Sequence, residues 1–256
     1  MQIHSFTMEQ KHIVDIHIPS YLVDKNQKLR PSCFLSLAQE MAMEAADVLH
    51  FGFDDLAQHN LAWVVSRTHL EFIDNPQWRD ELQFATWHKG IDGLFFLRDY
   101  LLTDKEGTVK IKGTSSWLVI DTQSRRLFRT DRLSEYFDVS AQCTENAVEQ
   151  PAPKIVIPKD AERVLAGKRT VKYSDVDFIG HANNTAYVLW SMDLLPDELV
   201  YEGRLKTLDI NFNLETRAGE EIELWLSEEK TPDEQIYYIE GKVDGRSHFT
   251  ARFIFQ

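Results

Sequence analysis

The chain has 256 residues, of which 43% are hydrophobic and 27% are charged, and its formal net charge is −13. This length suits one large or two small domains, and aromatic residues spread along the whole chain argue against disorder. The acidic balance disfavours binding to nucleic acids or to anionic membranes. No apolar run approaches the roughly 20 residues that span a bilayer, and the first residues carry no secretory signal.

The cysteines Cys33 and Cys143 lack the spacing of a metal site. One disulfide between them is possible. A reduced protein located in the cytoplasm is the expectation.

The first half of the chain predicts one long helix followed by a run of strands. A strand is expected near residues 10–18 and a helix near 32–49, where apolar residues recur at helical spacing. Gly52 is interpreted as the signal that stops this helix. Four β-rich stretches separated by glycine-containing turns follow, at 61–73, 81–89, 94–103 and 108–121.

Residues 131–165 interrupt this pattern with three prolines and few aromatic residues. We interpret this segment as a linker. The chain is therefore divided into an N-terminal unit at 1–135, a linker at 136–163 and a C-terminal unit at 164–256.

The second half returns to the same order of elements. A strand near 167–174 precedes a shorter helix at 183–195, which is expected to stop at Pro196. Four more strands are predicted, at 205–214, 221–228, 235–244 and 247–255.

An internal repeat follows from this order, β-α-β-β-β twice. The residues agree with it, because L-E-F at 70–72 corresponds to I-N-F at 210–212, and 21–35 aligns without gaps to 173–187. The alternative is that two unrelated hairpins with acidic turns look alike. A helix followed by an antiparallel sheet predicts a sheet wrapped around that helix, and pairing two such sheets removes exposed edges. The predicted fold is α+β, a tandem double hotdog.

The densest motif is D-V-D-F-I-G-H-A-N-N-T-A-Y at residues 175–187, a loop that feeds the second helix. Asn183 or Asn184 can cap this helix, and the free N–H groups at its N-terminus can hold an oxyanion. Asp177 and His181 lie just upstream, where a carboxylate and an imidazole can act on water or a carbonyl. Each residue also has a purely structural interpretation, as a turn, a cap or a packed histidine.

This motif resembles that of hotdog thioesterases, and the chain as a whole resembles the acyl-acyl-carrier-protein thioesterases of plant plastids and their bacterial relatives. Further segments carry the resemblance in the same order along the chain: N-L-A-W-V-V-S-R at 60–67, R-D-Y-L-L at 98–102, S-S-W-L-V at 115–119, S-R-R-L at 124–127 and Y-V-L-W at 187–190.

The resemblance implies a catalytic set of an Asp, an Asn and a His in the loop, with a Glu or an adjacent Cys on a later strand. Asp177 and His181 match by position, and Glu215 matches the Glu. Thr216 stands where plant members have Cys, which argues against a cysteine nucleophile. Ile179 occupies the position of the loop Asn and cannot form the hydrogen bonds of an amide side chain.

The internal repeat points to one active site per chain, in the C-terminal half. In the alignment, Lys25 corresponds to Asp177, Leu29 to His181 and Asn75 to Glu215, so the first repeat is expected to lack all three groups. The N-terminal half is then free to form an acyl pocket. Its candidate pocket residues, which ordinary core packing explains equally well, are Met41, Met43 and Trp63.

The resemblance implies hydrolysis of fatty acyl-acyl-carrier-protein thioesters, with no metal or organic cofactor. The alternatives are an acyl-CoA thioesterase and a non-catalytic acyl-binding hotdog protein. An acidic carrier needs a local basic patch, and the candidate is the cluster Arg125, Arg126, Arg129 and Arg132, with a second at Lys168, Arg169 and Lys172. A solvated surface with internal acidic partners is the other interpretation. A monomer or a homodimer is expected.

Overall fold

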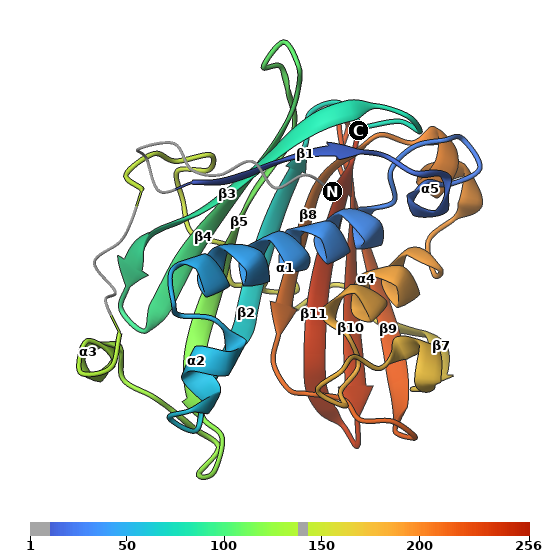
Figure 1. Cartoon of the computed structure of the whole chain (residues 1–256). Helices are drawn as coiled ribbons and strands as arrows, with labels where there is room; N and C mark the ends of the chain where they lie inside the picture. The colour runs from blue at the N-terminus through green and yellow to red at the C-terminus, as the bar shows by residue number, and fades with distance from the viewer. Residues whose placement is uncertain (1–10, 138–142) are drawn as a thin grey trace.

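The computed structural model describes residues 11–137 and 143–256. Within these ranges, a single antiparallel sheet of eleven strands curves around two principal helices (Figure 1). The strand order is β1-β3-β4-β5-β2-β8-β11-β10-β9-β7, and β6 pairs with β5.

The N-terminal unit contains one long helix and the first six strands. Its strands are β1 (His12–His17), β2 (Leu61–Phe72), β3 (Glu81–Asp92), β4 (Phe95–Asp104), β5 (Val109–Asp121) and β6 (Arg126–Leu127). Its helices are η1 (Ser20–Leu22), α1 (Pro31–Val48), α2 (Phe53–Ala57) and α3 (Thr130–Leu133).

The C-terminal unit repeats the arrangement with a shorter central helix. Its strands are β7 (Val164–Thr170), β8 (Leu205–Phe212), β9 (Glu221–Lys230), β10 (Gln235–Val243) and β11 (Arg246–Phe255). Its helices are η2 (Tyr173–Asp175), α4 (Asn184–Met192) and α5 (Asp197–Glu202).

The two units join through β2 and β8, which pair antiparallel from Arg67↔Asn211 to Glu71↔Thr207. The N-terminal unit has the order β1-β3-β4-β5-β2, and the C-terminal unit, read from its outer edge, has the equivalent order β7-β9-β10-β11-β8. The sheet is therefore continuous across a pseudo-two-fold axis, and each unit covers an edge of its partner. The predicted tandem double hotdog is confirmed.

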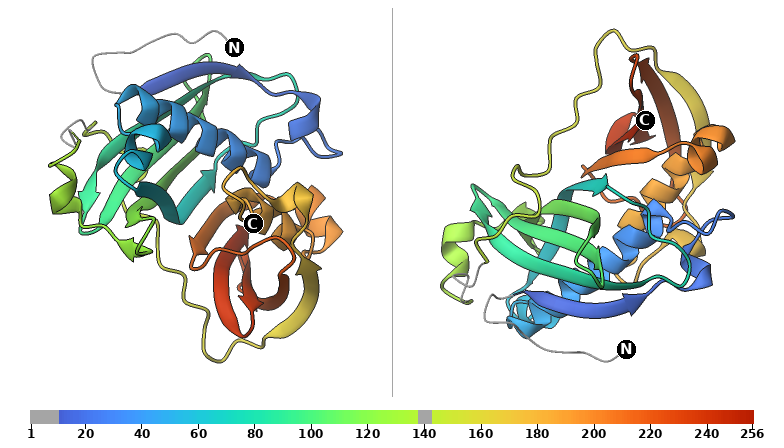
Figure 2. Two further views of the ribbon diagram at one scale, coloured as in Figure 1. Left: turned by 60° about the horizontal axis from the view of Figure 1, so that its bottom comes forward. Right: turned by 90° about the horizontal axis from the view of Figure 1, so that it is seen from above.

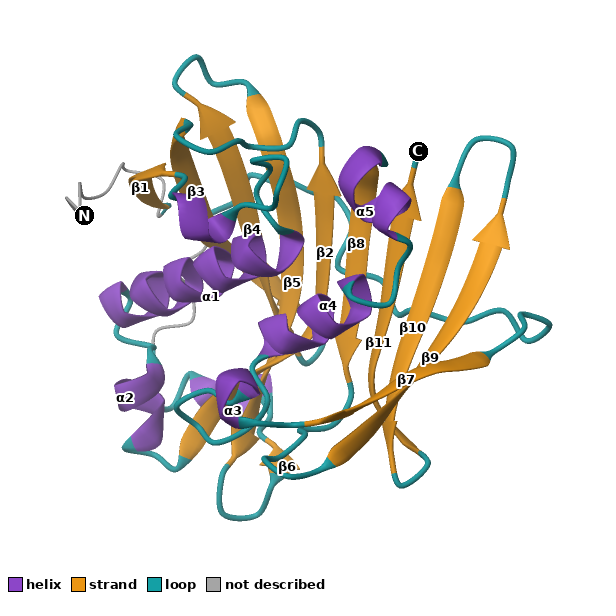
Figure 3. Ribbon diagram, turned by 90° about the vertical axis from the view of Figure 1, so that its right-hand side faces the viewer, coloured by secondary structure: helices purple, strands orange, loops and turns teal. Residues whose placement is uncertain are grey.

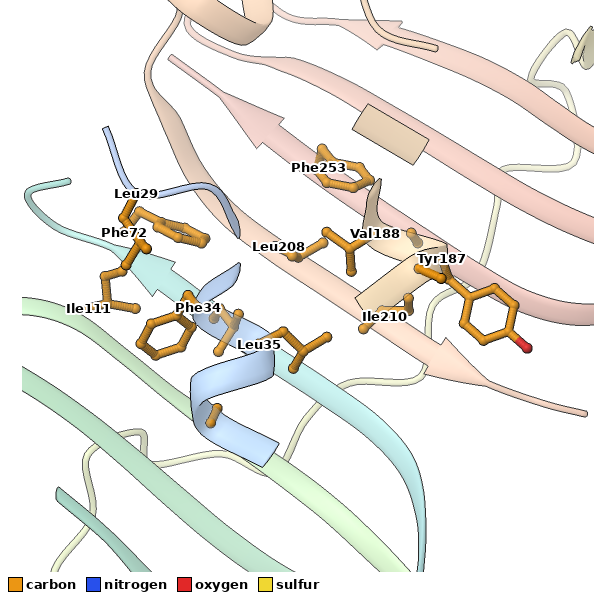
Figure 4. Close-up of a cluster of buried hydrophobic side chains, with 14 of the residues drawn as sticks. Leu29, Phe34, Leu35, Phe72, Ile111, Tyr187, Val188, Leu208, Ile210 and Phe253 are labelled. Atoms are coloured by element: carbon orange, nitrogen blue, oxygen red, sulfur yellow. The ribbon is translucent and has the colours of Figure 1, made fainter. Parts of the chain in front are cut away.

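The core lies between the inner face of the sheet and the two principal helices, which pack against each other on that face (Figure 3). On α1, the ring of Phe34 lies 5.4 Å from that of Phe84 and 6.4 Å from that of Phe72, centroid to centroid. On α4, Tyr187 and Val188 belong to the same cluster (Figure 4). A fully buried side chain of this size contributes about 1.5–3 kcal/mol through the apolar surface that it removes from water.

Residues 143–163 of the connection between the units run along the outside of the sheet (Figure 2). Asp99 on β4 accepts hydrogen bonds from the backbone N–H groups of Ala147, at 2.7 Å, and Val148, at 3.3 Å. Asn211 on β8 accepts from the N–H of Ile155 at 2.7 Å. Residues 143–163 of the predicted linker contain no helix or strand. The buried side chains of Asp99 and Asn211 hold this segment to the sheet.

Among the short helices that were not expected, α2 and α5 each follow a predicted stop signal. The helix α1 ends at Val48 with Leu49 as its cap, and Gly52 is the residue that precedes α2. Pro196 likewise precedes α5. The predicted end of α1 near residue 49 is confirmed, and Gly52 lies beyond it as expected, where it also precedes the next helix.

Cys33 and Cys143 are free thiols. Among the described residues, no helix combines the length and apolar character needed to cross a membrane.

Candidate active site

The loop between η2 and α4 is organised by the carboxylate of Asp177. Its Oδ1 atom accepts hydrogen bonds from the N–H groups of Ile179, at 2.9 Å, and His181, at 3.3 Å. The backbone closes the turn, since Asp177 N–H donates to the carbonyl of His181 at 2.9 Å. Gly180, with φ of 92°, occupies the left-handed region that favours glycine. Both side-chain bonds use Oδ1, so Oδ2 accepts nothing from the described residues.

Of the two asparagines that the sequence offers as caps, Asn183 caps α4. Its side-chain oxygen accepts from the N–H and the hydroxyl of Thr185, both at 2.9 Å. Gln39 on α1 bridges the two asparagines, because it donates to Asn183 Oδ1 at 3.3 Å and accepts from Asn184 Nδ2 at 2.9 Å. The backbone N–H of Asn184 has no acceptor among the described residues, so it remains available at the positive end of the helix.

His181 and Glu215 meet although they are far apart in sequence. His181 Nε2 lies 3.3 Å from Glu215 Oε2, and their side chains are 26% and 28% exposed. An isolated bridge between His181 and Arg217 places the loop beside the turn after β8. The structure therefore brings the predicted imidazole and carboxylate together.

Two arginines hold the carboxylate of Glu215. Arg217 donates to Oε1 at 2.7 Å, and Arg125, from the N-terminal unit, forms a short hydrogen bond to Oε2. Partial burial alone would raise the pKa of Glu215, but the hydrogen bonds from Arg125 and Arg217 outweigh it and lower the pKa. Glu215 is therefore ionised and poorly suited to accept a proton.

Thr216, which replaces the Cys of plant members, lies outside the reactive part of the site. It is fully buried, accepts a hydrogen bond from the Tyr187 hydroxyl at 2.9 Å and lies 2.8 Å from His248 Nδ1. Burial raises the pKa of Tyr187 and lowers that of His248. Ile179, at the family's Asn position, exposes half of its side chain.

A cavity of about 980 Å³ joins these groups to the N-terminal unit. Asp177, His181 and Glu215 line it on one side, and Met43 and Trp63 line it on the other. Further apolar walls come from Phe51, Phe96 and Trp117. Of the three expected pocket residues, Met41 is buried in the core, which contradicts its assignment to the cavity.

The structure corrects the alignment of the two repeats by one residue. Bridges Val23↔Leu29 and Val176↔Ala182 correspond, so Asp24, not Lys25, is the counterpart of Asp177. Asp24 Oδ1 accepts from the N–H groups two and four residues later, at 2.8 and 3.0 Å, as Asp177 does.

The prediction that the first repeat lacks all three groups is therefore wrong for the aspartate. Lys28, not Leu29, corresponds to His181, and Asn75 corresponds to Glu215. The imidazole and the second carboxylate are the features that distinguish the C-terminal loop from its counterpart.

The arginine cluster divides into different environments. Arg125 reaches into the cavity. Arg129 pairs with Asp131 at 2.7 Å, and the guanidinium of Arg132 lies 3.9 Å from Glu135. Arg126 is exposed and forms no ion pair with any residue in the described ranges.

Sequence reasoning missed three contributors to the site: Gln39, Arg217 and His248. Arg217 lies two residues beyond Glu215, and this proximity was the available signal. Gln39 sits on α1 and His248 on β11, so only the tertiary fold brings them to the loop.

The fold and the cavity define a tandem double-hotdog protein with a candidate hydrolytic site where its two units meet. The family model of the acyl-ACP thioesterase N-terminal domain matches residues 9–136. The family model of the acyl-ACP thioesterase C-terminal domain matches residues 159–256. The chain belongs to the acyl-ACP thioesterase family.

Relatives with solved structures have the same fold. An acyl-ACP thioesterase from Bacteroides thetaiotaomicron superposes with a TM-score of 0.84 and 23% identity, over 96% of this chain and 98% of that one. The 12:0-ACP thioesterase from Umbellularia californica gives a TM-score of 0.81 and 19% identity, over 100% and 99% of the two chains.

In sequence, the chain is 25% identical to oleoyl-acyl carrier protein thioesterase 2, chloroplastic, from Arabidopsis thaliana. The match covers 92% of this chain and 66% of the relative, so the chain spans slightly less than two thirds of that protein.

Proposed function

We propose that this protein hydrolyses fatty acyl-acyl-carrier-protein thioesters to free fatty acid and carrier protein. The observation that carries the proposal is the meeting of His181 and Glu215 in a cavity whose apolar walls continue into the N-terminal unit. The names of relatives specify oleoyl and 12:0 chains on acyl carrier protein, which supports a fatty acyl group as the occupant of that cavity.

In the proposed reaction, water held by Asp177 Oδ2 and His181 attacks the thioester carbonyl carbon. His181 takes the proton from water, and the ionised carboxylate of Glu215 stabilises the resulting imidazolium. The N–H of Asn184 at the helix N-terminus stabilises the oxyanion. When the carbon–sulfur bond breaks, the carrier thiolate takes the proton from His181, and the fatty acid leaves.

Thiol release from acyl carrier protein and from coenzyme A thioesters of equal chain length tests the proposal. We expect hydrolysis of the carrier thioester, and a loss of about 10²–10⁴ in kcat/KM for His181→Ala or Glu215→Gln. Hydrolysis of the coenzyme A thioester alone would move the proposal to that carrier. Binding of fatty acyl groups without turnover would identify a binding protein instead.

We propose that the exposed face bearing Arg126, Arg129 and Arg132 guides the acidic carrier to the cavity. Electrostatic guidance acts on association and weakens with salt. Arg126→Glu should therefore raise KM for the carrier thioester at low ionic strength, and it should not change hydrolysis of a short acyl thioester without protein. An equal loss on both substrates would contradict this role. We further propose that the protein is located in the cytoplasm and acts in fatty acid biosynthesis. Its proposed state is a monomer or a homodimer.

A further inference from the structure

The N-terminal unit contacts the candidate site of the C-terminal unit at three separate places. Gln39 on α1 binds both asparagines at the start of α4. Phe53 on α2 packs edge-on against Phe178 of the loop, with ring centroids 5.5 Å apart. Arg125, from the connection between β5 and β6, pairs with Glu215. Of the three contacts, only that of Arg125 is made to a side chain with a proposed part in the chemistry.

The backbone at Arg125 is unusual for an arginine. Its φ is 59°, in the left-handed region that disfavours side chains with a Cβ atom by about 1–2 kcal/mol. The turn is closed by Asp121, whose carbonyl accepts from Arg125 N–H at 2.9 Å and whose carboxylate accepts from Gln123 and Ser124. Glycine or asparagine would suit this position better, so the turn alone does not account for an arginine.

The side chain of Arg125 supplies a reason. Its Nη2 atom binds Oε2 of Glu215, the same oxygen that faces His181 Nε2 at 3.3 Å. Arg217, from the turn of Glu215 itself, binds the other oxygen. Arg125 is thus the group that holds the reactive side of the carboxylate, and it comes from the other unit.

We propose that Arg125 is a positioning residue through which the N-terminal unit fixes the Glu215 carboxylate against His181, so that the site is complete only when the two units are joined. This inference rests on the proposed function for its kinetic consequences, but the contact itself does not depend on turnover. The charged and titratable groups that face Glu215 are Arg125, Arg217 and His181, and His248 faces its backbone.

A pH dependence follows from this arrangement. Arg125 stabilises the ionised form of Glu215, so its removal lets the pKa of Glu215 rise. Glu215 then becomes protonated at a higher pH in Arg125→Ala than in the wild type, and a titration of Glu215 itself measures this shift. A residue that only supports the fold would lower activity without raising the pKa of Glu215.

The experiment compares Arg125→Ala and Arg125→Lys with Arg79→Ala. Arg79 is a matched control because it is exposed, has φ of 75° and contacts Trp78 instead of the cavity. On a short acyl thioester without protein, we expect Arg125→Ala to lower kcat about 10–100-fold, with little change in KM. Arg125→Lys should restore part of the rate, and Arg79→Ala should match the wild type. In a Glu215→Gln background, Arg125→Ala should add little further loss.

Three results would overturn the proposal: a loss confined to the carrier thioester, an unchanged pKa of Glu215 in Arg125→Ala, or losses that multiply with those of Glu215→Gln. A carbon NMR titration of Glu215 gives an independent measurement without substrate, and its pKa should be higher in Arg125→Ala. If the wild type hydrolyses no thioester, the proposed function fails. The NMR titration is then the test of the contact between Arg125 and Glu215. An unchanged pKa of Glu215 in Arg125→Ala would contradict the proposed role of Arg125.

Discussion

Asp177 and Asp24 occupy equivalent turns and make equivalent backbone hydrogen bonds, yet only Asp177 faces a histidine and a second carboxylate. The hydrogen bonds of Asp177 are therefore partly a property of the fold. A catalytic part for its carboxylate rests on Oδ2, which the turn does not use.

Asparagine substitutions separate these two contributions. An Asn side chain can keep Oδ1 as the acceptor of both backbone bonds, so Asp177→Asn and Asp24→Asn should change the melting temperature by similar, small amounts. Only Asp177→Asn should lose activity, by about 10²–10⁴ in kcat/KM if the carboxylate acts on water. Melting curves and thiol-release rates on both variants test this. Wild-type activity in Asp177→Asn would remove its carboxylate from the mechanism.

The sequence predicted the members of the site that lie in one motif, and it failed where contacts cross between units. Asp177 and His181 are four residues apart, so local geometry places them in one loop. Arg125 was assigned to a surface cluster because neighbouring arginines suggested a charged face. Its contact with Glu215, ninety residues away, depends on how the units pair, which no local pattern encodes.

At the scale of elements, the long helices were predictable and the short ones were not. The eighteen residues of α1 give several turns of apolar periodicity, whereas α2 and α5 have five and six residues. So short a segment completes fewer than two turns, and its apolar residues fit a loop or a strand equally well.

The start of α4 is held by a side-chain cap that its counterpart lacks. Asn183 accepts from Thr185 N–H, whereas Arg30, which precedes α1, makes no side-chain cap. Asn183→Ala should therefore lower the free energy of unfolding by about 0.5–2 kcal/mol, and Asn183→Ser should recover most of it. Urea unfolding of these variants, with Arg30→Ala for comparison, measures the effect. Equal stability of Asn183→Ala and wild type would mean that water replaces the cap at the N–H of Thr185.

At the scale of the whole molecule, the repeat brings two equivalent positions face to face. His69 on β2 and Asp209 on β8 correspond in the two units, and they pair with each other at the centre of the joined strands. His69 Nδ1 lies 2.6 Å from Asp209 Oδ1. Asp209 is fully buried, and two N–H groups of Arg252 donate to its other oxygen, at 2.9 and 2.7 Å. The symmetry of the backbone thus places an asymmetric, charged pair at the junction of the units.

This pair makes the stability of the double hotdog depend on pH. Burial alone would lower the pKa of His69, but the hydrogen bonds and charges of Asp209 and Glu71 outweigh it and raise the pKa. A raised pKa means that the charged pair stabilises the fold fully below the unfolded-state pKa of about 6.5, and that this contribution disappears as the pH rises through the folded-state value. The difference in free energy of unfolding between wild type and His69→Gln should therefore shrink from about pH 6 to about pH 9. Urea unfolding across this range tests it, and a difference that stays constant or grows with pH would show that protonated His69 does not strengthen the junction.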